Sequence, residues 1–324
     1  MATPHSGRAA PAATRLDDVV TRIGHPPDAG QPRIPPSRAV PHSAESGGAA
    51  FRRRPAACEP GGRPGKPGAP SGPPCEAPPV DRQQISRLAH AHHPIAAPLD
   101  DDSVRRLLAH AVPGDGARVL DLGCGGAEWL LRALTGHPRL TAEGVDVSAS
   151  ALDHARGAAA RLGVADRLTL HHEDAARFAA PHGFDLVLCV GSTHAFGGLP
   201  ATLAAAREHL APGGRVLVGD GFWEREPSPE AVESLGDLDD LPTTLDRVVA
   251  DGWTPVGGHI STRRELDDYE WAWTGALAAW ALDHPADPDR AQALETAIAH
   301  RDGWRRGYRD CLGFLCLALR PTDT

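Results

Sequence analysis

The residues best suited to chemistry in this 324-residue chain are glycines flanked by acidic side chains. Gly123 and Gly125 follow a short apolar run, residues 119–122, that contains Asp121, and a helical pattern begins directly after them. Glycine lacks a Cβ atom and permits positive φ, so a ligand can approach the backbone closely in such a turn. Free N–H groups at the start of the following helix favour anionic or polar ligand groups. This order of strand, glycine turn and helix predicts a nucleotide-binding loop.

Three families of ligand fit such a loop. A P-loop is disfavoured because no Gly-Lys-Ser/Thr sequence ends it. The dinucleotide fingerprint requires a third glycine three residues after Gly125, where this chain has Glu128. What remains resembles the first motif of the class I S-adenosylmethionine (SAM) methyltransferases, matched here by Asp121-Leu-Gly-Cys-Gly125. The chain departs from that motif at Ala127, where a third glycine is common.

A second acidic residue lies at the spacing that a nucleotide site requires. Asp146 ends the predicted strand 140–146 and stands 21 positions after Gly125. At that distance the next parallel strand brings a carboxylate to the same crevice, where it can accept hydrogen bonds from ribose hydroxyls. The alternative is helix capping, because Asp146 and Ser148 precede a helical pattern over residues 149–162. Given the glycine loop upstream, the ribose role is favoured.

Acidic residues also follow the third predicted strand, residues 168–172. In the methyltransferases that the glycine loop resembles, an acidic-Ala pair at this place contacts the adenine amino group. Asp174 and Ala175 match that pair. The competing interpretation makes the carboxylate an N-cap for a helix running through Phe178.

The fourth predicted strand, residues 184–190, ends in the polar, glycine-bounded loop 191–198. Loops at this edge of a parallel sheet carry substrate-binding groups in α/β enzymes. His194 in this loop is the candidate general base, since an imidazole exchanges protons near neutral pH. The alternative is that His194 only hydrogen-bonds substrate or backbone. A base is needed only if the acceptor atom is protonated.

A leucine, a Pro-Gly-Gly turn and an apolar strand follow in residues 210–220 and again resemble the class I methyltransferases. Four motifs in the expected order across residues 117–220 make the resemblance specific. It implies SAM as the cofactor and methyl transfer by in-line displacement. The residues that it assigns to cofactor binding are Asp121, Gly123, Cys124, Gly125, Asp146, Val147, Asp174, Ala175 and Val190.

The elements that must position these groups alternate between strands and helices. The resemblance implies an α/β, Rossmann-like fold, a seven-stranded, mostly parallel sheet with helices on both faces. A helical insertion, residues 263–310, is expected between the strands 253–260 and 312–319. It lies where small-molecule methyltransferases commonly build a lid.

The inserted segment carries an apolar stripe. Its members recur at helical spacing: Tyr269, Trp273, Leu277 and Trp280. Core packing is the ordinary explanation for such a stripe. The lid position offers a second one, in which Trp271 or Trp273 lines a substrate cavity. The candidate substrate contacts are His93, Trp223 and Trp273.

The first 80 residues differ in composition from the rest of the chain. They hold 17 prolines and 10 glycines, and they are predicted to form a disordered tail before a single methyltransferase domain, residues 81–324. Of the 33 basic and 42 acidic residues, 10 and 6 lie in this tail. The domain therefore keeps 23 basic and 36 acidic residues, a net charge of −13. An acidic domain argues against a nucleic-acid substrate.

Other features of the composition limit the partners and the location. No apolar run is long enough for a signal peptide or a membrane span. The six cysteines have no Cys-x-x-Cys spacing, so no metal site is predicted. We therefore expect a cytoplasmic protein with a small-molecule substrate and no membrane partner. The oligomeric state and the methyl acceptor are not determined by the sequence.

Two alternatives to a methyltransferase stay open at this level. One is a nicotinamide-dependent oxidoreductase, disfavoured by Glu128 and by the Pro-Gly-Gly turn before the fifth strand. The other is a SAM-binding regulatory protein without catalysis. A closer resemblance, to a largely uncharacterised bacterial group of small-molecule methyltransferases, is carried by the loop 191–198, by Gly219-Asp-Gly-Phe-Trp223 and by the tryptophan-rich insertion.

Overall fold

The computed structural model describes residues 82–322, and every structural statement below concerns that range. The predicted disorder of residues 1–80 lies outside the described residues.

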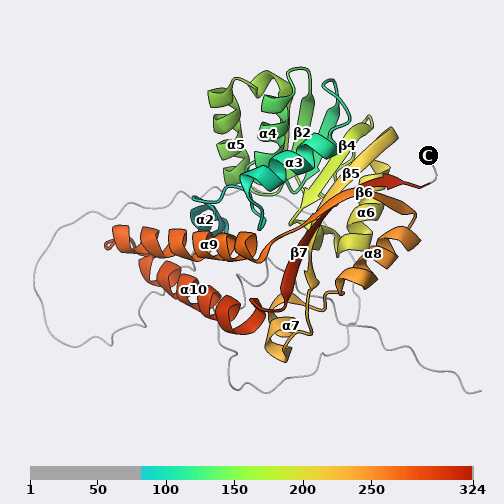
Figure 1. The fold of residues 1–324 in the computed structure, drawn as a ribbon. Helices are drawn as coiled ribbons and strands as arrows, with labels where there is room; N and C mark the ends of the chain where they lie inside the picture. The colour runs from blue at the N-terminus through green and yellow to red at the C-terminus, as the bar shows by residue number, and fades with distance from the viewer. Residues whose placement is uncertain (1–81, 323–324) are drawn as a thin grey trace, which may run out of the picture. The chain divides into compact units, whose positions relative to one another are not determined.

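The described residues form a seven-stranded sheet in the order β3-β2-β1-β4-β5-β7-β6 (Figure 1). Its strands are β1 (Arg118–Leu122), β2 (Thr141–Asp146), β3 (Leu168–His172), β4 (Phe184–Val190), β5 (Leu210–Trp223), β6 (Trp253–Ile260) and β7 (Leu312–Pro321). Strands β1 to β5 pair in parallel, whereas β7 runs antiparallel to its neighbours β5 and β6. The strand order reverses between β1 and β4, and open sheets bind ligands beyond the carboxyl ends of strands at such a point. The predicted fold is confirmed.

Helices cover both faces of the sheet because residues on its strands alternate in direction. Val119 joins one apolar core with α3, α4 and α5, whereas its neighbour Leu120 joins the core under α6 and α8. The helices are α2 (Arg82–Ala89), α3 (Asp101–Ala111), α4 (Glu128–Gly136), α5 (Ala149–Leu162), α6 (Leu199–Glu208), α7 (Pro229–Leu235), α8 (Leu241–Ala250), α9 (Arg263–Asp283) and α10 (Arg290–Gly303), with the short turns η1 (Ala165–Arg167), η2 (Thr193–Phe196) and η3 (Trp304–Tyr308). No helix within residues 82–322 is both long enough and apolar enough to span a membrane.

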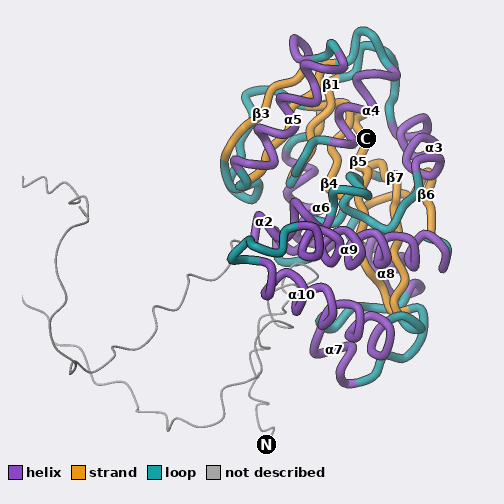
Figure 2. The backbone as a smooth tube through the Cα atoms, turned by 90° about the vertical axis from the view of Figure 1, so that its left-hand side faces the viewer, coloured by secondary structure: helices purple, strands orange, loops and turns teal. Residues whose placement is uncertain are grey.

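The insertion between β6 and β7 is helical, as expected, and consists of α9, α10 and η3. Helix α9 packs against α10 and α2, and both views of the backbone place these helices side by side (Figure 1 and Figure 2). Trp273 and Leu277 of the predicted stripe are buried in the cluster that the three helices share, and Tyr269 and Trp280 pack against it. Packing between helices therefore accounts for the stripe.

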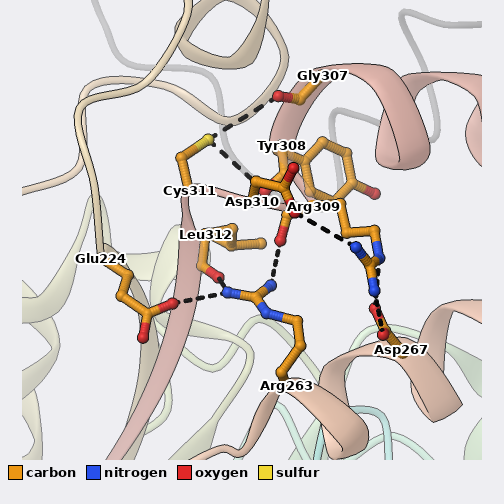
Figure 3. A network of polar contacts seen from close by, with 9 residues as sticks. All are labelled: Glu224, Arg263, Asp267, Gly307, Tyr308, Arg309, Asp310, Cys311 and Leu312. Carbon is orange, nitrogen blue, oxygen red and sulfur yellow. Dashed lines mark hydrogen bonds and ion pairs between the residues drawn. The ribbon is translucent and has the colours of Figure 1, made fainter.

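A polar network joins the two ends of the insertion to each other and joins Arg263 to Glu224, just after β5, and to Leu312 at the start of β7 (Figure 3). Arg263, the first residue of α9, forms an ion pair with Glu224 at 2.6 Å and donates to the backbone oxygens of Leu312 and Arg309. Arg309, just after η3, donates two hydrogen bonds to the carboxylate of Asp267, at 2.7 and 2.9 Å. Such a two-point pair fixes orientation as well as distance. The inserted helices are thus held at both ends.

One local expectation is wrong, and one helix of the structure was not expected. The helix through Phe178 is absent from the structure, since the segment after Asp174 forms a turn closed by the N–H of Arg177 on the Asp174 carbonyl at 2.9 Å. Phe178 is instead buried against the sheet. The capping explanation for Asp174 therefore has no helix to cap. Helix α7 was not expected, because its seven residues are too few to establish a helical period.

Candidate active site

The glycine loop after β1 has the backbone conformation that its sequence predicts. Gly123 and Gly125 have φ of +81° and +50°. The N–H groups of Gly123 and Cys124 both donate to the carbonyl of Val145, at 2.9 and 3.0 Å, which fixes the loop beside β2. Ala127, the departure from the family motif, also has positive φ, +59°. A non-glycine residue in this region carries strain, which a glycine at the same place would avoid.

The two glycines serve different purposes. A Cβ atom at Gly123 would lie 2.6 Å from the Cβ and Oγ atoms of Ser192, so this glycine allows the loop after β4 to pack closely. Ser192 in turn donates to the carbonyl of Leu122 at 2.8 Å. A Cβ atom at Gly125 would meet nothing within 4 Å. The backbone at Gly125 therefore faces open space, as a loop that binds a ligand through its backbone requires.

Asp146, at the end of β2, is held by the backbone of the glycine loop. The N–H of Gly125 donates to Oδ2 at 2.7 Å, and the N–H of Ser148 donates to Oδ1 at 2.7 Å. Each oxygen has a further lone pair, so the anchored carboxylate can accept hydrogen bonds from two hydroxyl groups. Ser148, not Asp146, is the N-cap of α5, because its side chain accepts from the N–H of Ala151. The capping explanation for Asp146 is therefore wrong.

Asp121 is a buried carboxyl group with an unsatisfied oxygen. It is 3 % exposed, and its Oδ2 has no hydrogen-bond partner among the described residues. Burial, reinforced by the negative charge of Asp146, raises the pKa of Asp121 to about 8. Burial also raises the pKa of the neighbouring Cys124 thiol, with both carboxylates adding to the effect. Asp121 thus offers an acceptor to a cationic or hydrogen-bonding ligand group, whereas Cys124 is a small buried thiol and no nucleophile.

The segment after β3 lies next to Asp146, since the N–H of Glu173 donates to the Asp146 carbonyl at 3.2 Å. The side chain of Asp174 is about half exposed and accepts from the N–H of Ala176 at 3.0 Å, while Ala175 is buried. Val147 is exposed, and its carbonyl contacts Nε2 of His172 at 2.9 Å.

A cavity lies beyond the ends of β4 and β5, with about 720 Å³ of space between atoms, part of it open to solvent. Its wall includes Gly191, the residue directly after Val190 of β4. Polar and aromatic side chains in the wall are Thr193, His194, Asp220, Tyr269, Glu270 and Phe314. The loop 96–98 forms another part of the wall and approaches so closely that a Cβ atom at Gly191 would lie 2.9 Å from the Ala96 carbonyl oxygen.

Comparison with known proteins identifies the family. Residues 120–216 match the model of a methyltransferase domain. The chain is 27 % identical over 246 residues to the uncharacterized protein YjhP of Escherichia coli (strain K12), covering 74 % of this chain and 99 % of that protein. A SAM-dependent methyltransferase from Geobacter sulfurreducens, solved with S-adenosyl-L-homocysteine, is 27 % identical with a TM-score of 0.69, covering 74 % of this chain and 98 % of that chain. A SAM-dependent methyltransferase from Thiobacillus denitrificans, also solved with S-adenosyl-L-homocysteine, is 28 % identical with a TM-score of 0.67, covering 74 % of this chain and 98 % of that chain.

The chain belongs to the class I SAM-dependent methyltransferases. The cofactor of this methyltransferase is SAM, and its reaction is methyl transfer to a small molecule. The residues present fit that cofactor, because Gly125 opens onto free space, Asp146 keeps unused lone pairs and Asp121 has an orphaned oxygen. The family leaves no support for a nicotinamide-dependent oxidoreductase.

The residues predicted to contact the substrate of this methyltransferase lie in different surroundings. His194 lies in the cavity wall, on η2. His93 is not among the wall residues, but its ring lies perpendicular to that of Tyr269, at 5.4 Å between centroids, so it packs on a side chain of the wall. Trp273 is buried between helices and stacked on His300, and Trp223 is buried against α7. Trp273 packs in the apolar cluster of the inserted helices, and Trp223 packs in the cluster that includes α7. Neither side chain belongs to the cavity wall.

Sequence reasoning missed Asp220, Tyr269 and Glu270 as parts of the cavity wall. Tyr269 was assigned only to the apolar stripe. One signal for Glu270 was available, since Glu270, Trp273 and Leu277 share one helical face by their spacing. An acidic residue on the buried face of a helix is unusual and marks either a polar network or a site.

Proposed function

We propose that this enzyme methylates a small-molecule acceptor that binds in the cavity bounded by the loop 96–98, η2 and α9. The position of the cavity carries the proposal. It adjoins the end of β4 at Gly191, next to Val190, and the glycine loop lies at the end of the neighbouring strand β1. An acceptor in this cavity would therefore lie beside the cofactor crevice, at the carboxyl edge where α/β enzymes bring ligands together.

The proposed cofactor contacts follow from the donors and acceptors that each residue retains. Asp146 would accept from the ribose hydroxyls, and Asp121 from the amino group of the methionine portion. Gly123, Cys124 and Gly125 would line the loop side. Val147, Asp174, Ala175 and Val190 would surround the adenine and ribose. Bound SAM supplies a methyl group made electrophilic by its sulfonium, so the protein's main tasks are alignment and exclusion of water.

His194 is the proposed general base for an acceptor that must lose a proton. It follows β4 on η2 and lines the acceptor cavity, where its imidazole can reach a bound molecule. An acceptor without an acidic proton would need His194 only as a hydrogen-bonding group.

The acidic balance of residues 81–324 supports a small molecule rather than a nucleic acid as acceptor. We also propose that the enzyme is located in the cytoplasm. Its methyltransferase domain begins near residue 81, and α9 and α10 act as a lid.

Calorimetric titration of the full chain with SAM tests the cofactor site. We expect micromolar binding, about −8 kcal/mol. Asp146→Ala should weaken it by about 1–3 kcal/mol, because two hydrogen-bond acceptors are lost. Asp153→Ala, which removes an exposed carboxylate on α5, is the matched control and should bind as the wild type does. Full SAM affinity in Asp146→Ala would refute the assigned contact.

Turnover tests the proposed role of His194. Release of S-adenosyl-L-homocysteine should rise when a panel of small nucleophiles is added to the full chain, and His194→Ala should lower that rate for acceptors with an acidic proton. An unchanged rate in His194→Ala for such acceptors would refute the role of His194 as general base.

A further inference from the structure

Glu270 of α9 is a buried carboxylate that lines the acceptor cavity. It is 6 % exposed, and it belongs to the cavity wall together with its neighbour Tyr269. Burying a carboxylate is costly unless hydrogen bonds replace its hydration. The packing of α9 alone would be served better by an apolar residue, so the acidic side chain at this position requires an explanation.

Two side chains of the inserted segment hold this carboxylate. Nε2 of His300 lies 2.7 Å from Oε2 of Glu270, and the hydroxyl of Tyr308 donates to Oε1 at 3.0 Å. His300 is stacked on Trp273 at 4.1 Å between ring centroids, which fixes the plane of the imidazole. Burial, followed by the charge of Glu270, raises the pKa of Tyr308 well above its usual value, so its hydroxyl stays protonated as a donor.

The two partners of Glu270 can both act as hydrogen-bond donors. Nδ1 of His300 is buried and has no hydrogen-bond partner among the described residues. A neutral imidazole with its proton on Nε2 donates to Glu270 and exposes only a lone pair at Nδ1. Either form of the ring that carries a proton on Nε2 can donate to Glu270. His300 and Tyr308 therefore each take up one carboxylate oxygen as donors, and each oxygen keeps a lone pair for a ligand.

The remainder of the cavity suits a positive charge on an apolar body. Asp220 contributes a second carboxyl group, and none of the described residues in the wall is an arginine or lysine. Tyr269 and Phe314 contribute aromatic rings, which attract cations through their faces. Most of the remaining wall is apolar, including Leu266 and Leu312.

We propose that Glu270 determines acceptor specificity by binding a protonated amine, and that His300 and Tyr308 are positioning residues for its carboxylate. This inference rests on the proposed function of the cavity. The substrate class is a small organic amine with an apolar or aromatic body. The amine is the group that the cavity recognises, and the reaction stays the methyl transfer of the family.

A network that only joined α9 to α10 would make a different prediction. Its loss would lower stability and would weaken every ligand of the cavity to a similar extent. A specificity role instead changes the ratio between charged and neutral ligands, so this ratio is the quantity to measure.

The test uses the full chain saturated with S-adenosyl-L-homocysteine and three probes of one shape: 2-phenylethylamine, 2-phenylethanol and phenylacetate. Calorimetry should give an affinity for the amine at least about tenfold above that for the alcohol, and weaker binding still for phenylacetate. Glu270→Gln keeps the size of the side chain and should remove the preference for the amine while leaving the alcohol's affinity unchanged. Tyr308→Phe should reduce the preference severalfold. Glu295→Gln, an exposed carboxylate on α10, should leave it unchanged.

The outcomes separate this inference from the proposed function. Failure of the wild type to bind S-adenosyl-L-homocysteine would overturn the cofactor site and both proposals. Normal binding of that product, with no preference for the amine or no binding of any probe, would overturn only the role of Glu270. A preference that survives in folded Glu270→Gln, verified by an unchanged affinity for S-adenosyl-L-homocysteine, would do the same.

Discussion

The cofactor side of the sheet, β1 to β4, and the acceptor side, β5 to β7 with α9 and α10, hold their carboxylates in different ways. Asp146 on the cofactor side is held by backbone N–H groups of Gly125 and Ser148, which lie 21 and 2 positions away in the chain. Glu270 on the acceptor side is held by the side chains of His300 and Tyr308, 30 and 38 positions away. Backbone donors exist whatever the side chains are, whereas the donors to Glu270 depend on which residues stand at positions 300 and 308.

This difference indicates which of the two sites can vary between related sequences. A cofactor site built from a glycine turn and one carboxylate works in many sequences, so it persists as a motif across a family. An acceptor site built from side-chain networks can be replaced as a unit when the substrate changes. Four experiments can break or sharpen this contrast, and they are ordered by the size of the expected effect.

Gly123→Ala should have the largest effect, on the cofactor side. The new Cβ atom would lie 2.6 Å from Ser192, at a φ of +81°, so both a clash and backbone strain arise. We expect the free energy of unfolding to fall by about 3 kcal/mol in urea denaturation. Gly125→Ala is the matched control, since its Cβ would meet nothing within 4 Å, and should cost about 1 kcal/mol. Equal losses in the two variants would contradict the separate roles of these glycines.

Glu265→Gln should have the next largest effect, on the acceptor side. Glu265 lies in the first turn of α9 and accepts from the Ser103 hydroxyl at 2.6 Å, from the N–H of Thr262 at 2.8 Å and from the N–H of Asp100 at 3.2 Å. Burial opposes its ionisation, but these hydrogen bonds outweigh burial and lower the pKa of Glu265 to about 2. The substitution should reduce the free energy of unfolding at pH 7 by about 2 kcal/mol.

The pH dependence provides the check on Glu265. Its folded pKa lies below the unfolded value of 4.5, so the stabilisation is complete above pH 4.5 and is lost as the pH falls toward 2. In urea denaturation, the gap between the wild type and Glu265→Gln should therefore narrow as the pH is lowered from 7 to 3. Asp268→Asn, at an exposed ion pair on the same helix, should track the wild type throughout. A constant gap between wild type and Glu265→Gln would be evidence against this account.

Asp121→Asn should change SAM affinity by about tenfold at pH 8. In the free enzyme Asp121 has a pKa of about 8, so it is protonated at pH 7. A cationic group beside it favours the ionised form, and binding should release a proton and tighten as pH rises from 6 to 8. Calorimetry in buffers of different ionisation enthalpy measures that proton. Asp121→Asn, which cannot ionise, should show neither the proton release nor the rise in affinity.

The carboxyl group of Asp121 also links stability to pH, in the opposite direction from that of Glu265. The folded pKa of Asp121 lies above the unfolded value of 3.8, so its contribution is complete below pH 3.8 and is lost as pH rises through about 8. The cofactor-free wild type should therefore lose more thermal stability between pH 5 and pH 8 than Asp121→Asn does. Equal losses of thermal stability in the wild type and in Asp121→Asn across that range would contradict the burial of a protonated carboxyl group.

Arg309→Lys should have the smallest effect, a slight fall in the free energy of unfolding. The half-exposed arginine donates twice to Asp267, and a lysine cannot reproduce that geometry. Arg305→Lys, at an exposed pair with Asp302, should change nothing measurable. Urea denaturation of both variants tests whether the insertion is fastened at its end as the structure indicates, and equal effects would argue that it is not.

Local patterns in the sequence were reliable where backbone chemistry decides the structure. The bounds of α5, β3, β4 and β6 agree with those predicted, because capping residues, glycines and apolar runs mark them directly. The helix through Phe178 failed for the opposite reason: burial of that ring against the sheet outweighed the local preference for a helix. The assignment of Trp223 and Trp273 to the substrate likewise followed residue type, and packing partners far away in the chain accounted for both rings instead.

By itself, the sequence determined the sheet, the glycine loop and the carboxylate of Asp146, because each depends on backbone geometry and on spacings of a few to about twenty residues. Only the tertiary structure brought Tyr269 of α9 against His90 and His93 of the N-terminal segment, 179 and 176 positions away. It also placed Glu270 in the wall of the acceptor cavity. Contacts of that range depend on how whole helices pack, and no local period encodes them.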